Sequence, residues 1–320
     1  MSKPKVAFYW CASCGGCEEA VVDLAEDILT VVEVVDIVFW PVAMDFKRED
    51  VENMKDGEIL VSFINGAIRL SEQEEMVKLL RRKSQLVIAF GSCAHLGGIP
   101  GLANQFGGDK ILNFVYEDAP TTENPEKTRP QVHFKEDKYE FELPEFYDSV
   151  KALDQVIEVD YYIPGCAPPR NIVKDAVTAL LKGELPSKGS VLASDKSLCH
   201  ECPLNETKPE KIEIKEFKRP HQVEIDPEKC LLLQGLICLG PVTRGGCDAL
   251  CIKGNMPCTG CFGPLDGVID YGAKALSYLA SIIDSNDEKE IEEIMKGIPD
   301  PLGTFYRYSL PKSLLFKTKR

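Results

Sequence analysis

Two cysteines separated by two glycines stand near the start of the chain, in the run Cys14-Gly15-Gly16-Cys17. They follow an apolar segment, residues 5–10, whose composition is typical of a β-strand. Two thiolates at this spacing can bind one edge of a metal or iron-sulfur centre, and glycine lets the backbone approach that centre closely. This motif is therefore the first candidate for chemistry in the sequence.

The chain has 13 cysteines and only four histidines among its 320 residues. Disulfide bonds do not account for so many cysteines in a reducing compartment, so the cysteines indicate metal binding. Zinc sites in such number often include histidine, and the almost purely thiolate set therefore favours iron-sulfur clusters. The cysteines are Cys11, Cys14, Cys17, Cys93, Cys166, Cys199, Cys202, Cys230, Cys238, Cys247, Cys251, Cys258 and Cys261.

Composition excludes several classes of partner. No apolar run approaches the roughly 20 residues that span a bilayer, so we expect no membrane span. The formal charge of −14 disfavours nucleic acid and anionic membranes, because an acidic surface offers them no positive field. The N-terminus enters the first expected strand without a signal-peptide pattern, and we therefore expect a cytoplasmic protein.

Strands and helices alternate in the first half, which predicts a flavodoxin-like, doubly wound parallel sheet of the α/β class. The expected strands are residues 5–10, 34–39, 59–64, 86–90 and 156–163. The expected helices are residues 18–29, 71–83 and 170–182, with two more at 271–283 and 288–295. Ser71 and Glu74 match a capping box at the start of the second helix.

In an open parallel sheet, ligands bind outside the carboxyl ends of the strands. Cys14 and Cys17 follow the first expected strand, Cys93 follows the fourth, and Cys166 follows the fifth. Three separate segments should therefore bring four thiols to the same edge of the sheet.

The chain divides into two expected domains, residues 1–185 and 186–320. Residues 107–147 form a polar, proline-containing insertion with a possible hairpin, 131–135 with 139–143. A linker at 184–190 marks the boundary. Beyond it regular elements are sparse as far as residue 268, so eight cysteines are expected to hold a smaller, irregular second domain.

These eight cysteines are enough for two sites with four thiols each. The spacings are Cys199-x2-Cys202, Cys230-x7-Cys238 and Cys247-x3-Cys251-x6-Cys258-x2-Cys261. Soft thiolate ligands suit iron-sulfur clusters, and the many glycines and prolines let the loops wrap around them. From spacing alone, two zinc ribbons remain an alternative.

Together these motifs resemble those of the small subunit of nickel-iron hydrogenases. The resemblance rests on Cys-Gly-Gly-Cys-Glu-Glu at 14–19, Gly-Ser-Cys-Ala at 91–94, Pro-Gly-Cys-Ala-Pro-Pro at 164–169 and the Cys-x2-Cys-Pro and Gly-Pro-x-Thr-Arg runs further on. It covers nearly the whole chain. The pattern is most similar to the cytoplasmic, methyl-viologen-reducing type that does not use deazaflavin and that works with heterodisulfide reductase.

The resemblance implies three 4Fe-4S clusters, which we call proximal, medial and distal. The proximal set would be Cys14, Cys17, Cys93 and Cys166. The medial set would be Cys247, Cys251, Cys258 and Cys261. The distal set would be Cys199, Cys202, Cys230 and Cys238. Cys11 and Cys14 form a second Cys-x2-Cys register, and the resemblance and the two glycines favour the register of Cys14 with Cys17.

The implied activity is that of a hydrogenase, an oxidoreductase acting on hydrogen, in which this chain transfers electrons. The nickel-iron site would lie in a partner large subunit, and the clusters would pass electrons to an iron-sulfur acceptor subunit linked to heterodisulfide reductase. Glu19 matches a family carboxylate that could move protons. No flavin or nucleotide is expected in this chain, because cysteines replace a phosphate-binding loop after the first strand.

Three alternatives stay open at this point. The chain could be the small subunit of a deazaflavin-, NAD(P)- or sulfur-reducing hydrogenase, since other subunits select the acceptor. A quinone-reductase subunit related to complex I shares the sheet, but that family has adjacent cysteines in its first motif and no second domain. A zinc-ribbon binding module on a flavodoxin-like domain is the third, and visible absorption would distinguish it from an iron-sulfur protein.

Overall fold

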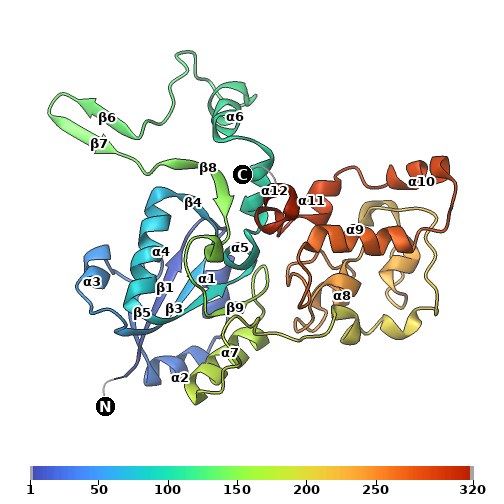
Figure 1. Ribbon diagram of the computed structural model, residues 1–320, viewed down its shortest axis with the longest axis horizontal. Helices are drawn as coiled ribbons and strands as arrows, with labels where there is room; N and C mark the ends of the chain where they lie inside the picture. Colours follow the sequence, from blue (N-terminus) through green and yellow to red (C-terminus); the bar gives the residue numbers. More distant parts are fainter. Residues whose placement is uncertain (1–2, 318–320) are drawn as a thin grey trace.

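A five-stranded parallel sheet organises the first half of the chain in the computed structural model, which describes residues 3–317 (Figure 1). The strand order is β2-β1-β3-β5-β9, so the chain reverses its direction of winding between β1 and β3. The strands are β1 (Lys5–Trp10), β2 (Asp36–Phe39), β3 (Ile59–Asn65), β5 (Ser84–Phe90) and β9 (Tyr161–Ile163). The predicted α/β class with a doubly wound parallel sheet is confirmed.

Helices cover both faces of this sheet, and the alternation of side chains along β1 explains why. Val6 and Phe8 belong to one apolar core, whereas Ala7 belongs to the core on the opposite face. The first face is covered by α1 (Gly16–Val22), α2 (Asp27–Val34) and α7 (Arg170–Lys182). The second face is covered by α3 (Arg48–Glu52), α4 (Ser71–Lys83) and α5 (Ser92–Leu96).

Three local predictions were wrong. The helix expected over residues 18–29 is two helices, because Ala25 has a φ of 51° and breaks the hydrogen-bond ladder. The strand expected over 156–163 begins only at Tyr161, because the Asp160 side chain accepts the Val87 N–H at 2.8 Å. The capping box of Ser71 and Glu74 does not form, since Gln73 accepts the N–H of Leu70 at 3.0 Å instead.

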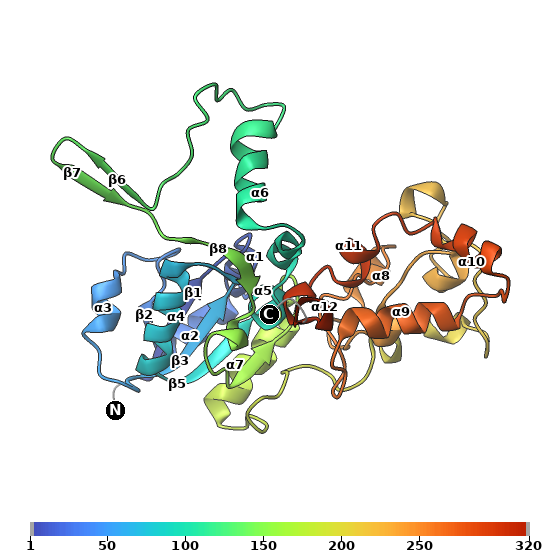
Figure 2. The same ribbon diagram turned by 45° about the horizontal axis from the view of Figure 1, so that its top comes forward.

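The insertion projects from the body of the molecule as an arm, residues 107–147 (Figures 1 and 2). It starts with α6 (Gly108–Asn113), continues through a wider helical turn (Phe114–Asp118), and forms the antiparallel pair β6 (His133–Glu136) and β7 (Tyr139–Glu142). The predicted hairpin is therefore confirmed. The chain then returns to the body through β8 (Phe146–Lys151), which pairs with β4 (Ile68–Leu70).

The cysteine-rich region lies beside the carboxyl edge of the sheet and consists of short helices and loops (Figure 1). The α-helices are α8 (Leu250–Lys253), α9 (Tyr271–Ser281), α10 (Glu288–Met295), α11 (Pro301–Phe305) and α12 (Leu314–Lys317). The 3-10 helices of the chain are Ile99–Gln105, Leu153–Gln155, Leu198–His200, Asn205–Thr207, Pro220–Gln222, Leu231–Gln234, Gly240–Val242 and Leu310–Lys312. This region has its own apolar core, which includes Leu232, Leu236 and Phe305.

No helix within residues 3–317 is both long and apolar enough to cross a membrane.

A buried carboxylate ties the start of β9 to its neighbours. The Asp160 side chain is 1% exposed and lies 2.6 Å from both Arg81 Nη1 and Lys188 Nζ. Burial alone would raise the pKa of Asp160, but the hydrogen bonds from Lys188, Arg81 and the Val87 amide outweigh burial and lower it. The charged form is therefore the one that stabilises this edge of the sheet.

Replacing this carboxylate by an amide should destabilise the sheet. We expect Asp160→Asn to cost about 2 kcal/mol, because hydrogen bonds to a charged group are weakened, and to lower the Tm by roughly 5 °C. Thermal unfolding followed by circular dichroism measures this change. Glu158→Gln is the matched control, since Glu158 is exposed two residues away; an equal effect of both substitutions would contradict the role given to Asp160.

Candidate functional site

The four cysteines of the proximal set lie at the carboxyl ends of three strands. Cys14 and Cys17 flank the turn from β1 into α1, Cys93 lies in α5 directly after β5, and Cys166 follows β9. Cys17 and Cys93 are buried, whereas Cys14 and Cys166 are exposed. Gly15 has a φ of 88°, a left-handed conformation that glycine adopts without strain, and this lets the chain turn between the two thiols.

These four thiols lie within electrostatic reach of one another. Burial raises the pKa of Cys17 most, and Cys93, Cys166 and Cys14 raise it further as like charges. The pKa of Cys93 rises to about 12, again through burial first and then through Cys166 and Cys14. The structure thus brings together the residues that the strand-end argument predicted would converge.

Two glycines make room for the sulfur atoms. A Cβ on Gly91 would lie 2.3 Å from Cys17 Sγ, and one on Gly98 would lie 2.4 Å from Cys93 Sγ. Both distances are far below van der Waals contact, so a side chain at either position would displace the thiol. Glycine at these positions therefore lets the backbone lie directly against the sulfurs.

Cys11 lies apart from this set. It is buried in the apolar core on the face covered by α4, among residues such as Ile64 and Ile68. Its pKa is raised by burial and then by Glu72, and not by another cysteine. Of the two possible registers, the structure places Cys14 and Cys17 with the other proximal thiols and leaves Cys11 in the core.

The two glutamates after Cys17 differ sharply in environment. Glu19 is exposed on α1. Glu18 is buried, accepts a hydrogen bond from Trp40 Nε1, and accepts another from Asn65 Nδ2 at 2.5 Å. Burial raises the pKa of Glu18, although both hydrogen bonds oppose this shift. Sequence reasoning singled out Glu19 and missed Glu18, because the partners of Glu18 come from β3 and the loop after β2.

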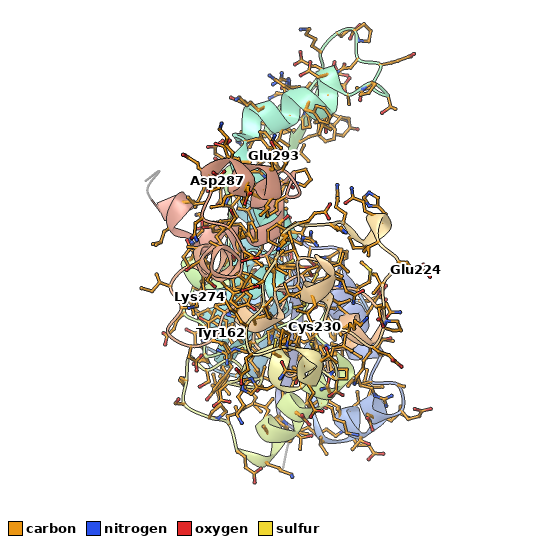
Figure 3. All side chains as sticks on the ribbon, turned by 90° about the vertical axis from the view of Figure 1, so that its right-hand side faces the viewer. Tyr162, Glu224, Cys230, Lys274, Asp287 and Glu293 are labelled. Carbon is orange, nitrogen blue, oxygen red and sulfur yellow. The ribbon has the colours of Figure 1, made fainter. Side chains whose placement is uncertain are left out.

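All four cysteines of the distal set line one pocket. Leucine and isoleucine side chains form most of its remaining wall, with Leu198, Leu204 and Ile252 among them. Cys230, labelled in Figure 3, lies in the body of the molecule, far from the projecting α6. Its backbone N–H donates to Thr207 Oγ1 at 2.9 Å, which fixes the loop that carries it.

A lysine reaches into this pocket, and no motif in the sequence pointed to it. Lys208 Nζ donates to Cys199 Sγ at 3.0 Å and to Asn205 Oδ1 at 2.9 Å. Burial alone would lower the pKa of Lys208, but the hydrogen bond to Cys199 and the charges of Cys199 and Cys230 raise it. The pocket therefore contains a positive charge directly against one of the four thiols.

The medial set lies in α8 and in the loops before and after it. Cys251 lies in α8 and is exposed, Cys258 is buried, and Cys247 and Cys261 are partly exposed. Burial raises the pKa of Cys261 to about 12, with contributions from the charges of Cys247, Cys166 and Cys251. These thiols therefore also lie close together.

Direct contacts connect the three sets in a series. Ser92 Oγ, next to Cys93, donates to the Cys261 carbonyl at 2.5 Å, which joins the proximal set to the medial set. The Cys258 N–H points at Cys238 Sγ over 3.4 Å, which joins the medial set to the distal set. The medial set thus lies between the other two, although its cysteines come last in the sequence.

The donor chemistry fits iron-sulfur clusters. Each set offers four thiols with neighbouring backbone N–H groups and glycines, as cluster-binding loops do. Soft thiolate ligands without histidine suit an iron-sulfur core in particular.

Comparison with known proteins agrees with this chemistry. A family model described as NADH ubiquinone oxidoreductase, 20 Kd subunit, matches residues 14–180. The chain is 43% identical to the iron-sulfur subunit of the F420-non-reducing hydrogenase of Archaeoglobus profundus, and the match covers 98% of each chain.

Chains of solved hydrogenase structures are also similar to this protein. A chain of an NAD+-reducing NiFe hydrogenase is 29% identical, with a TM-score of 0.50, over 57% of this chain and 94% of that one. A chain of the NiFeSe hydrogenase from Desulfovibrio vulgaris Hildenborough shares the fold, with a TM-score of 0.53 and 19% identity over 83% of this chain and 95% of that one. The protein therefore belongs to the family of NiFe hydrogenase small subunits, together with the iron-sulfur subunits of F420-non-reducing hydrogenases.

Proposed function

We propose that this small subunit relays electrons from hydrogen oxidation in a partner large subunit, through three 4Fe-4S clusters, to an iron-sulfur acceptor subunit that leads to heterodisulfide reductase. One observation carries the proposal: the three sets of four thiols follow one another across the molecule, with Ser92 beside Cys93 hydrogen-bonded to Cys261 and with Cys258 in contact with Cys238. Clusters bound at these sites would supply one-electron transfer.

The ligands follow from the three sets. We assign Cys14, Cys17, Cys93 and Cys166 to the proximal cluster, Cys247, Cys251, Cys258 and Cys261 to the medial cluster, and Cys199, Cys202, Cys230 and Cys238 to the distal cluster. The convergence of each set supports this assignment. Among the 13 cysteines only Cys11 then remains, and it is buried in the sheet core. The chain has no thiols left for a nickel-iron site, which we therefore place in the large subunit.

The proximal edge is the expected contact with that subunit. Cys14 and Cys166 are exposed there, so a partner has to cover them to exclude water and oxygen from the cluster. Glu19 is exposed two residues after Cys17, and we propose that it passes protons from the partner to solvent. The buried Glu18 instead accepts hydrogen bonds from Asn65 and Trp40, and these bonds fix the start of α1, which carries Cys17.

The likeness to the iron-sulfur subunit of an F420-non-reducing hydrogenase supports an acceptor other than F420. We also propose a reducing, cytoplasmic location, which is supported by the finding that all 13 cysteines are free thiols in the structure. The cysteine-rich region has a main apolar core of its own, although its Phe262 packs in the core of the sheet, and this supports a division into domains at 1–185 and 186–320.

Metal content tests the function directly. The protein purified anaerobically with its large subunit should contain about twelve irons and twelve sulfides per small subunit, and should absorb visible light. Zinc in place of iron, with no visible absorption, would mean that the chain is not an electron relay. A content of about eight irons would mean that the chain binds two clusters and not three.

The two N-terminal registers can be separated by a pair of substitutions. Cys14→Ala should abolish hydrogen-dependent reduction of viologen dye, because the cluster nearest the large subunit loses a ligand. Cys11→Ala should keep most of this activity and cost about 1 kcal/mol of stability, since it only removes a buried sulfur from the core. Dye-reduction assays on the two purified complexes measure the difference, and the reverse pattern would refute the assignment.

Lys208 should tune the distal site. Its ammonium group donates to Cys199 and favours the reduced, more negative cluster, so Lys208→Met should lower the midpoint potential of that cluster. Lys208→Arg should shift it less, and Lys211→Met, an exposed neighbour, should not shift it at all. A redox titration followed by EPR on the intact complex gives the potential. An unchanged potential in Lys208→Met, with unchanged iron content, would show that the lysine only supports the loop.

A further inference from the structure

The arm carries an apolar surface that the electron relay does not use. In the register of β6 and β7, Phe134 pairs with Phe141 and Glu136 pairs with Tyr139. The rings of Phe134 and Phe141 lie 6.3 Å apart, and those of Tyr139 and Phe141 lie 6.4 Å apart, so these three rings share one face. Val132 and Leu143 extend the same face by the alternation of side chains along each strand.

All five side chains of this apolar face are large and face solvent. Their exposed fractions are 42% for Val132, 48% for Phe134, 58% for Tyr139, 51% for Phe141 and 52% for Leu143. The opposite face of the ribbon is polar, with an ion pair between Lys135 and Glu140 at 2.8 Å and with His133 Nδ1 lying 3.4 Å from Glu142. The ribbon is thus amphipathic although it packs on no other part of the described chain.

Such a ribbon is poorly suited to stand alone in water. An isolated two-stranded hairpin is marginally stable at best, and a continuous apolar patch on a surface marks an interaction site. Hydrogen bonds order other parts of the arm, since Gly108 N–H donates to Asp148 at 2.6 Å and Asn124 donates to Tyr116 O at 2.9 Å. The arm thus has local order of its own, while the apolar face of the ribbon is exposed.

The size of this face decides between kinds of partner. Two strands of about five residues cover a footprint of roughly 17 Å by 10 Å, about 170 Å². A stable interface needs about 800 Å² on each side. The ribbon is therefore too small to hold two copies of this chain together by itself, and it fits best as an extension of a larger interface.

The route of the chain identifies that larger interface. The arm leaves the body shortly after Cys93, through the 3-10 helix Ile99–Gln105, at the proximal edge of the sheet. Exposed apolar side chains follow this route outward, with Ile99 at 50%, Phe106 at 54% and Phe114 at 59% exposed. The root of the arm is therefore apolar and exposed at the edge that the large subunit should cover, and α6 and the ribbon extend the same segment of chain outward from there (Figures 1 and 2).

We propose that the arm is a docking element that binds the hydrogenase large subunit through the apolar face of the β6–β7 ribbon. The proposal rests on the assignment of a large subunit as partner at the proximal edge. The binding surface on the large subunit should be apolar, because five half-exposed apolar side chains are available to pack against it.

The test uses the complex of both subunits. Phe134→Ser with Phe141→Ser should weaken binding of the large subunit at least tenfold, whereas Lys135→Ser with Glu140→Ser, on the polar face of the same ribbon, should leave it nearly unchanged. The concentration at which each purified complex dissociates on dilution, measured by mass photometry, gives the affinities. Equal affinity of the apolar variant and wild type would overturn the proposal.

A photo-crosslinking residue at position 141 gives a second readout that does not depend on folding of a disrupted ribbon. Crosslinks from position 141 should reach the large subunit, and those from position 140 should not. Crosslinks to a second small subunit instead would overturn the proposal. The iron content of each variant is measured as well, so that docking through the ribbon and the electron relay are tested separately. A protein that binds the large subunit through the ribbon but contains no clusters would refute the relay and leave the docking proposal standing.

Discussion

The burial of Phe262 beside Cys261 is the packing interaction on which the relay depends. Phe262 is only 2% exposed and belongs to the core of the sheet, with Ile163 and Ile172, although it comes from the cysteine-rich region. Burying such a ring contributes about 2 to 3 kcal/mol. Ser92 Oγ donates to the carbonyl of Cys261 at 2.5 Å, which fixes the backbone there. The medial set is therefore held against the proximal edge by apolar packing and a backbone hydrogen bond.

This anchor explains why the order of the sites in space differs from their order in the sequence. The distal cysteines come before the medial ones, but residue 262 brings the chain back to the sheet, and the loop between Cys251 and Cys261 has to pass between the two. Leu239 N–H donates to the Cys258 carbonyl at 2.9 Å, so the two loops are joined by their backbones where they pass. Spacing in the sequence carries no signal for such an arrangement, because it arises from tertiary packing.

Sequence reasoning predicted those parts of the site that depend on local sequence pattern. Strand ends placed Cys14, Cys93 and Cys166 at one edge, because all parallel strands end at the same side of a sheet. It did not find Lys208 or the buried role of Glu18, since each is defined by contacts with segments that are distant in space or irregular in conformation. It also extended the first helix through Ala25, because alanine favours helix and nothing in the sequence indicates its left-handed φ.

The charged side chains near the proximal thiols differ in sign from the one near the distal thiols. This difference bears on the direction of electron transfer. At the proximal end the thiols lie beside Glu18 and Glu19, whereas at the distal end Lys208 donates to Cys199. A carboxylate near a cluster disfavours an added electron, and an ammonium group favours it. Lys208 is also only partly exposed, so solvent screens its charge less than that of a surface lysine. In the relay that we propose, this arrangement of charges favours electron flow from the proximal edge toward the pocket formed by Cys199, Cys202, Cys230 and Cys238.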